Sequence, residues 1–129
     1  MEVTTHRGEG KLQQVIEIGP HSLLTDAPVE SGGEASGPAP HDFLAAALAA
    51  CTSLTVTMYA KRKGFPLDDI AVSVKHGQDG AAYVLHRTIR YIGALAPEQA
   101  ERLTDIANKC PVHKTLTGQM QIFTEVAAS

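Results

Sequence analysis

Residues 43–60 read FLAAALAACTSLTVTMYA, a run of 18 residues without a charge. Members that recur at four- and three-residue intervals share one stripe of an α-helix: Leu44, Leu48, Cys51, Thr55 and Met58. Three cations and Gly64 follow the run, as is typical of a helix C-terminus. The pattern predicts a helix over about residues 41–63, buried on nearly all sides within a protein core.

A membrane span is the alternative for this run. Its length is near the lower limit for crossing a bilayer, and Lys61-Arg62-Lys63 follows it like an anchor. However, alanine contributes little apolar area, and three threonines and a serine interrupt the run. The surrounding sequence is rich in alternating strand patterns. We therefore expect no contact with a membrane.

Alternation of apolar and polar residues predicts strands on both sides of the helix. Before it, residues 11–19 alternate and Gly19-Pro20 ends the pattern, so residues 21–26 form a return strand. The Gly-, Pro- and Ser-rich stretch 27–40 is a loop. After the helix, residues 67–76 and 82–92 form a hairpin in which Arg87 interrupts an otherwise apolar face.

The C-terminal third predicts a second helix and a last strand. Pro97-Glu98 opens the helix, Cys110 lies in its last turn, and Pro111 stops it. Residues 120–126 alternate as a final strand. This order of elements indicates an α+β fold.

Length and composition limit the class of protein. The chain has 129 residues, 43% of them hydrophobic and 19% charged, with a net charge of −3. This is typical of a single globular domain over residues 1–129, without the basic surface that nucleic acid requires. The N-terminus has no apolar segment of a signal peptide, so we expect a cytoplasmic protein with reduced thiols.

Two cysteines are the strongest chemical candidates. Cys51 and Cys110 lie on the apolar faces of the two predicted helices, and both faces must pack on the sheet, so the sulfurs could meet. Buried packing cysteines are the simpler interpretation. Reactivity would require stabilisation of a thiolate. Cys51 is far from the start of its own helix, so we expect a cation to act instead: Arg7, a histidine, Arg87 or Arg90.

Cofactor chemistry has little support. Cys110 and His113 have half of a zinc-type spacing, but a structural zinc site usually shows two such pairs. The chain has no glycine-rich nucleotide motif and no nucleophile elbow. We expect no metal and no cofactor.

The cysteine segments resemble those of a known family. GPAPHDFLAAALAACT at 37–52 and MYAKRKG at 58–64 are similar to the central helix of the OsmC/Ohr family, the osmotically inducible and organic hydroperoxide resistance proteins. Cys110-Pro111-Val112-His113 resembles its second cysteine motif. The resemblance implies an antiparallel sheet wrapped on a long buried central helix, in an intertwined homodimer with active sites at the interface.

The resemblance also implies an activity, a thiol peroxidase acting on organic hydroperoxides. Cys51 would be the peroxidatic cysteine, Cys110 the resolving cysteine, and Arg7 the assisting cation. An external dithiol, such as a lipoyl-type reductant, would restore both thiols.

One position departs from the family pattern. The peroxidase branches carry Glu ten residues before the first cysteine, where this chain has His41. Asp42 follows, which rotates the carboxylate by about 100° around the helix. The chain is therefore similar to the OsmC-like branch, with His41 and Asp42 as supporting residues. A non-catalytic protein that binds a small apolar ligand at the dimer cleft, and thiol chemistry on another electrophile, remain alternatives.

Overall fold

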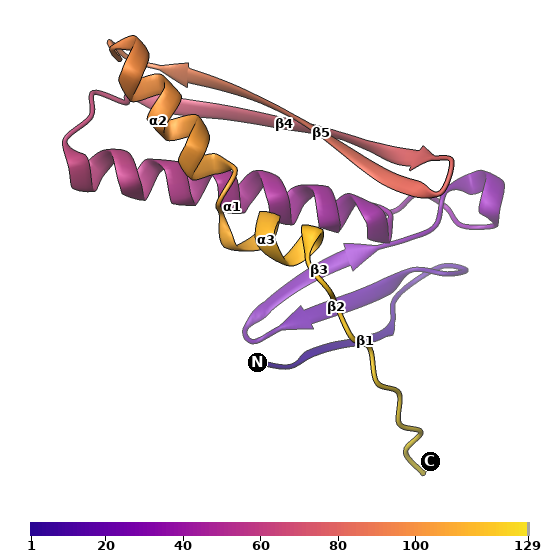
Figure 1. Cartoon of the computed structure of the whole chain (residues 1–129). Coiled ribbons are helices and arrows are strands. Elements are labelled where there is room, and N and C mark those ends of the chain that lie inside the picture. The colour runs from indigo at the N-terminus through magenta and orange to yellow at the C-terminus, as the bar shows by residue number, and fades with distance from the viewer. Residues whose placement is uncertain (129) are drawn as a thin grey trace. The chain divides into compact units, whose positions relative to one another are not determined.

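The computed structural model describes residues 1–128, which form two compact units that divide between Ala46 and Ala47. The first unit contains strands β1 (Val3–Arg7), β2 (Gln14–Ile18) and β3 (His21–Thr25) (Figure 1). They form an antiparallel sheet with β2 in the middle. The predicted hairpin of β2 and β3 is confirmed, whereas β1 and the short 3₁₀ turn η1 (Val29–Ser31) were not predicted.

A buried carboxylate organises the loop that follows β3. Asp26 accepts hydrogen bonds from the backbone N–H groups of Ala27, Glu34 and Ser36, and from the Ser36 hydroxyl. The Ser36 hydroxyl and N–H contribute most to lowering the pKa of Asp26 to about 2. These bonds favour the ionised form, so the stability of the loop conformation is coupled to the charge of Asp26.

Helix α1 (Pro40–Lys63) confirms the first prediction. Asp42 accepts a hydrogen bond from the Ala39 N–H at its start, and Gly64 at φ 70° follows its last residue. Burial on nearly all sides is not seen within the single chain, where Leu54 and Met58 are 64% and 66% exposed. These apolar side chains lie on a face of the helix that the chain itself leaves uncovered.

Helix α1 is long and apolar enough, by length and composition, to cross a membrane. Its most apolar window has a mean hydropathy of 1.6, and 33% of that window is buried in the structure. The core helix of a soluble protein meets the same criterion, so this is weak evidence for a span.

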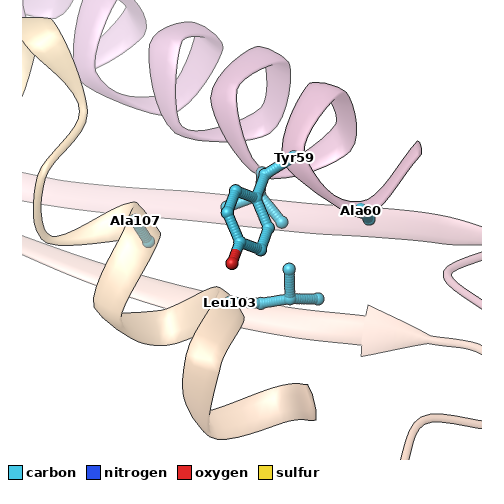
Figure 2. Close-up of a cluster of buried hydrophobic side chains, with 5 residues drawn as sticks. Tyr59, Ala60, Leu103 and Ala107 are labelled. Carbon is cyan, nitrogen blue, oxygen red and sulfur yellow. The ribbon is translucent and has the colours of Figure 1, made fainter. Parts of the chain in front are cut away.

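The second unit builds its core around the C-terminal half of α1. Strands β4 (Asp69–Asp79) and β5 (Ala82–Ile92) form an antiparallel hairpin, followed by α2 (Pro97–Ala107) and α3 (Pro111–Thr117). Figure 2 shows Tyr59 of α1 and Leu103 of α2 facing each other in this core. Ile70, Ile89 and Tyr91 from the hairpin pack against the cluster, which therefore joins both helices to the sheet.

Two predictions for the C-terminal third are wrong. Pro111 does not stop the second helix but starts α3, because proline suits the first position of a helix. Residues 120–126 form no strand: within residues 1–128 they pair with no other segment. A strand needs a hydrogen-bonded neighbour as well as an alternating sequence, and the single chain does not provide one here.

Candidate functional site

Cys51 lies in the middle of α1 and is partly exposed. Its sulfur is 3.7 Å from the hydroxyl oxygen of Thr55, one turn further along the helix. The i, i+4 spacing of a helix places these two side chains on the same face. The sulfur of this partly exposed residue thus has a hydroxyl group beside it.

Cys110 lies before α3, not in the last turn of α2 as predicted, since α2 ends at Ala107. It is the N-cap residue of α3, and its sulfur accepts a hydrogen bond from the backbone N–H of His113 at 3.4 Å. The side chain is fully buried. The hydroxyl oxygen of Thr52 is 4.0 Å from the sulfur.

The structure brings the two thiols together. Burial is the largest influence on the Cys51 thiol and raises its pKa, but three hydrogen bonds outweigh it and lower the pKa overall. The donors are the backbone N–H of Val112, the Thr55 hydroxyl and the Cys110 thiol. Hydrogen bonds to the charged form stabilise a thiolate. Cys51 is therefore predisposed to ionise beside a second thiol.

The donor from Val112 corrects one expectation. Cys51 is far from the start of its own helix, but it lies against the first turn of α3, which Val112 occupies. Backbone N–H groups in a first helical turn have no partner within the helix and carry partial positive charge. A helix start therefore does contribute at Cys51, although it belongs to another helix, and no sequence pattern signals this contact.

Arg87 is the cation that joins the elements around the thiols. Its guanidinium donates to Thr52 Oγ1 at 3.0 Å, Ala107 O at 3.3 Å, Asn108 Oδ1 at 2.8 Å and His113 Nδ1 at 3.1 Å. Because arginine can only donate, Nδ1 of His113 must accept in this arrangement. Thr52 and Asn108 were not among the predicted site residues. The one sequence signal was the charge of Arg87 within an apolar strand face.

The other predicted site residues lie elsewhere in the chain. Arg7 ends β1 in the first unit, where its Nη2 donates to the carbonyl oxygens of Gly10 and Lys11 at 3.4 and 3.0 Å. His41 and Asp42 lie in the first turn of α1 and belong to the same unit. Arg90 is exposed on β5, opposite Ala71 on β4.

Two hollows are each lined by a residue that contacts one of the thiols. One, of about 200 Å³, is lined by Leu48, Tyr83, Leu85, His113, Leu116 and Thr117. The other, of about 330 Å³, is lined by Thr55, Met58, Tyr59, Arg62, Ile106, Lys109 and Pro111. His113 connects the first to Cys110, and Thr55 connects the second to Cys51. Both hollows offer apolar surface to an organic group near the sulfurs.

Within residues 1–128, no three His, Cys, Asp or Glu side chains gather as a metal site. Cys51 and Cys110 are both free cysteines.

The chain was compared with protein-family models and with curated proteins. The family model of OsmC-like proteins matches residues 33–125. None of the curated proteins matches the chain significantly in sequence.

Several solved structures share the fold. An OsmC-like protein from Mycoplasma pneumoniae superposes with a TM-score of 0.75, at 20% identity over 91% of this chain and 86% of that chain. An organic hydroperoxide resistance protein OsmC from Legionella pneumophila gives 0.68, at 22% identity over 91% and 88%. An organic hydroperoxide resistance protein from Elizabethkingia anophelis gives 0.67, at 18% identity over 90% and 86%. The α+β arrangement of antiparallel sheets and a long helix is common to all three.

Proposed function

Because this chain belongs to the OsmC-like protein family, we propose that it is a thiol peroxidase that reduces organic hydroperoxides. The observation that carries the proposal is the placement of two free thiols in one site, with Thr55 beside the Cys51 sulfur and Thr52, the residue after Cys51, beside the Cys110 sulfur. Hydrogen bonding, to which Cys110 contributes, also lowers the pKa of the Cys51 thiol despite its burial. A peroxidase of this kind needs a thiolate with a second thiol beside it. The solved relatives named for organic hydroperoxide resistance support the substrate class.

The chemistry has three balanced steps. The Cys51 thiolate attacks one peroxide oxygen and the O–O bond breaks, which gives a Cys51 sulfenic acid and an alkoxide that takes up a proton and leaves as an alcohol. The Cys110 thiol then attacks the sulfenic acid sulfur, forms the disulfide and releases water. An external dithiol, which we propose to be of the lipoyl type, reduces the disulfide and is itself oxidised.

Arg7 remains our proposed assisting cation. A guanidinium is always charged and can hold a peroxide oxygen with its fork of donors. His41 and Asp42 remain proposed supporting residues in place of the family's Glu. We propose the cytoplasm as the location, because its reducing pool keeps such thiols ready to react.

We propose that the active form is a homodimer. Ile122, Phe123 and Val126 are about nine-tenths exposed in the single chain, at 91%, 88% and 91%. Leu54 and Met58 on α1 are exposed as well. Apolar surface of this extent is typical of a protein interface, and the alternating residues 120–126 would gain a partner there. Light scattering at micromolar concentration should give twice the mass of the chain, and a monodisperse monomer would contradict the dimer.

The test of the activity is hydroperoxide consumption. Cumene and tert-butyl hydroperoxide are compared with hydrogen peroxide, with dihydrolipoamide as reductant and Cys51→Ser as the matched control. We expect the two organic substrates to be consumed faster, because the hollows beside the thiols are mainly apolar. Consumption no faster than in the Cys51→Ser variant would exclude the peroxidase and favour a ligand-binding protein with packing cysteines.

A further inference from the structure

Arg87 lies at a position of β5 where the alternation of apolar and polar residues predicts an apolar side chain. Its neighbours at i−2 and i+2 on β5 are Leu85 and Ile89, and Ile89 packs against the core cluster. Placing a charge on such a face has a desolvation cost, so the guanidinium must gain compensating contacts. It gains four, from three different segments: α1, the end of α2 with the turn after it, and α3.

None of these four acceptors is a carboxylate. The contacts of Arg87 are hydrogen bonds to neutral groups at fixed positions. A planar fork of donors suits this arrangement better than a single point charge would.

Each contact of Arg87 lies beside one of the two cysteines. Thr52 follows Cys51 in α1, and its hydroxyl oxygen is also 4.0 Å from the Cys110 sulfur. Ala107 and Asn108 begin the turn that leads to Cys110. His113 accepts from Arg87 through its ring and donates to the Cys110 sulfur through its backbone N–H. Arg87 thus links both sides of the thiol pair.

We propose that Arg87 is the positioning residue for the second step of the reaction, the attack of Cys110 on the oxidised Cys51. The inference rests on the proposed peroxidase function. Arg87 holds the turn that carries Cys110 against α1, so that the Cys110 sulfur stays within reach of the Cys51 sulfenic acid. It touches neither sulfur directly in the structure, and its effect passes through Thr52, Asn108 and His113.

The two steps should therefore respond differently to its loss. The first oxidation depends on the Cys51 thiolate, whose hydrogen bonds come from Val112, Thr55 and Cys110. The second depends on the alignment of two sulfurs, and a displacement of about 1 Å can slow an intramolecular step by about 10²-fold. Loss of Arg87 is expected to slow disulfide formation by at least about tenfold and to leave Cys51 oxidation within about twofold of wild type.

The experiment compares Arg87→Gln, Arg87→Lys and Arg90→Gln in the full-length protein. Arg90→Gln removes the same charge from an exposed position on the same strand. After one equivalent of cumene hydroperoxide, sulfenic acid is trapped with a dimedone probe and disulfide is measured by mass spectrometry over time. The equilibrium of the disulfide with glutathione is measured as well, because a change in overall stability alone would not shift it.

We expect slow disulfide formation, accumulated sulfenic acid and a weaker disulfide in both Arg87 variants, with wild-type behaviour in Arg90→Gln. Lysine keeps the charge but cannot reach four separated acceptors, so Arg87→Lys should not rescue. If Arg87→Gln fails to fold, Asn108→Ala removes one exposed contact of the network and should slow the same step by a few-fold.

Failure of the inference and failure of the proposed function are distinguishable. A wild-type protein that forms neither sulfenic acid nor disulfide would refute the peroxidase function itself. A wild-type protein that forms both, with an Arg87→Gln variant that forms the disulfide at the same rate, would overturn the role of Arg87. A wild-type rate in Arg87→Lys would overturn it too, by showing that charge alone suffices.

Discussion

The hydroxyl oxygen of Thr55 lies 3.7 Å from the sulfur of Cys51, one helical turn away on α1. A hydroxyl group at this position can donate to a thiolate, which offsets part of the effect of burial on the pKa of Cys51. Replacement of this hydroxyl by a methyl group isolates its effect, since valine and threonine have the same shape.

Thr55→Val should raise the pKa of Cys51 and slow its alkylation at pH 7 by about three- to tenfold, the effect of one weak hydrogen bond to a charged group. The measurement is the rate of iodoacetamide alkylation against pH. Thr57→Val makes the same change at an exposed position of the same helix and should have no effect. Equal profiles for the two variants would show that Thr55 does not stabilise the thiolate.

Substitution of each cysteine in turn should distinguish the roles of the two thiols. Cys110→Ser should leave alkylation of Cys51 nearly intact and abolish only the disulfide, whereas Cys51→Ser should abolish hydroperoxide consumption. Cys110 is fully buried and Cys51 is partly exposed, so the alkylating reagent should reach Cys110 more slowly than Cys51. Mass spectrometry of the alkylated protein identifies the reacting residue. Faster labelling of Cys110 would reverse the assigned roles.

Thr52 should contribute to the stability of the fold. It is fully buried, donates to Leu48 O at 2.7 Å and accepts from Arg87 at 3.0 Å. Thr52→Val leaves a partly buried donor of Arg87 without this acceptor, which is expected to lower the free energy of unfolding by about 1–3 kcal/mol. Urea unfolding provides the measurement. A change within about 0.5 kcal/mol would show that Ala107 O and Asn108 satisfy the guanidinium by themselves.

The charge of Asp26 should make the free energy of unfolding depend on pH in the acid range. The folded pKa of about 2 lies below the unfolded value of 3.8, so the contribution is complete above pH 3.8. It is lost as the pH falls through about 2. The difference in unfolding free energy between wild type and Asp26→Asn should follow this course in denaturant titrations. A difference that is independent of pH would indicate packing instead of charge.

Arg7→Ala should slow alkylation of Cys51 at pH 7 by about tenfold or more, the scale of one pKa unit. A cation would add to the hydrogen bonds that Cys51 receives from Val112, Thr55 and Cys110. Lys11→Ala removes the same charge nearby in the sequence and serves as the control. If both variants react like wild type, Arg7 is not the activating cation, and His41 is the next candidate.

Local patterns predicted most of the regular elements. Helix α1 and the β4–β5 hairpin have unbroken periodicities over many residues, so they were found within a few residues of their ends. β1 was missed because its five residues are all exposed and show little alternation of apolar residues. α3 was missed because the proline at residue 111 was interpreted only as the end of a helix, although proline also favours the first turn.

Tertiary contacts explain what the sequence could not predict at the site. The sequence indicated that Cys51 and Cys110 could meet, but it placed Cys110 on the face of α2, whereas the structure has it at the N-cap of α3. The Val112 donor, the Thr52 contact and the Asn108 contact depend on how α3 begins and where β5 lies against α1. The alternation over residues 120–126 was real, but strand formation depends on a neighbour that the sequence of one chain does not specify.

The backbone amide of His113, which donates to the N-cap residue of α3, should report the oxidation state of Cys110. The sulfur of Cys110 accepts the backbone N–H of His113, and a thiol and a disulfide differ in how well and in what direction they accept. The amide resonance of His113 in a ¹⁵N-labelled sample should therefore shift, and its hydrogen exchange rate change, whenever Cys110 gains a covalent partner. The protein thus carries a spectroscopic indicator of turnover in its own backbone, on the amide that donates to the Cys110 sulfur, and needs no attached fluorophore or other probe.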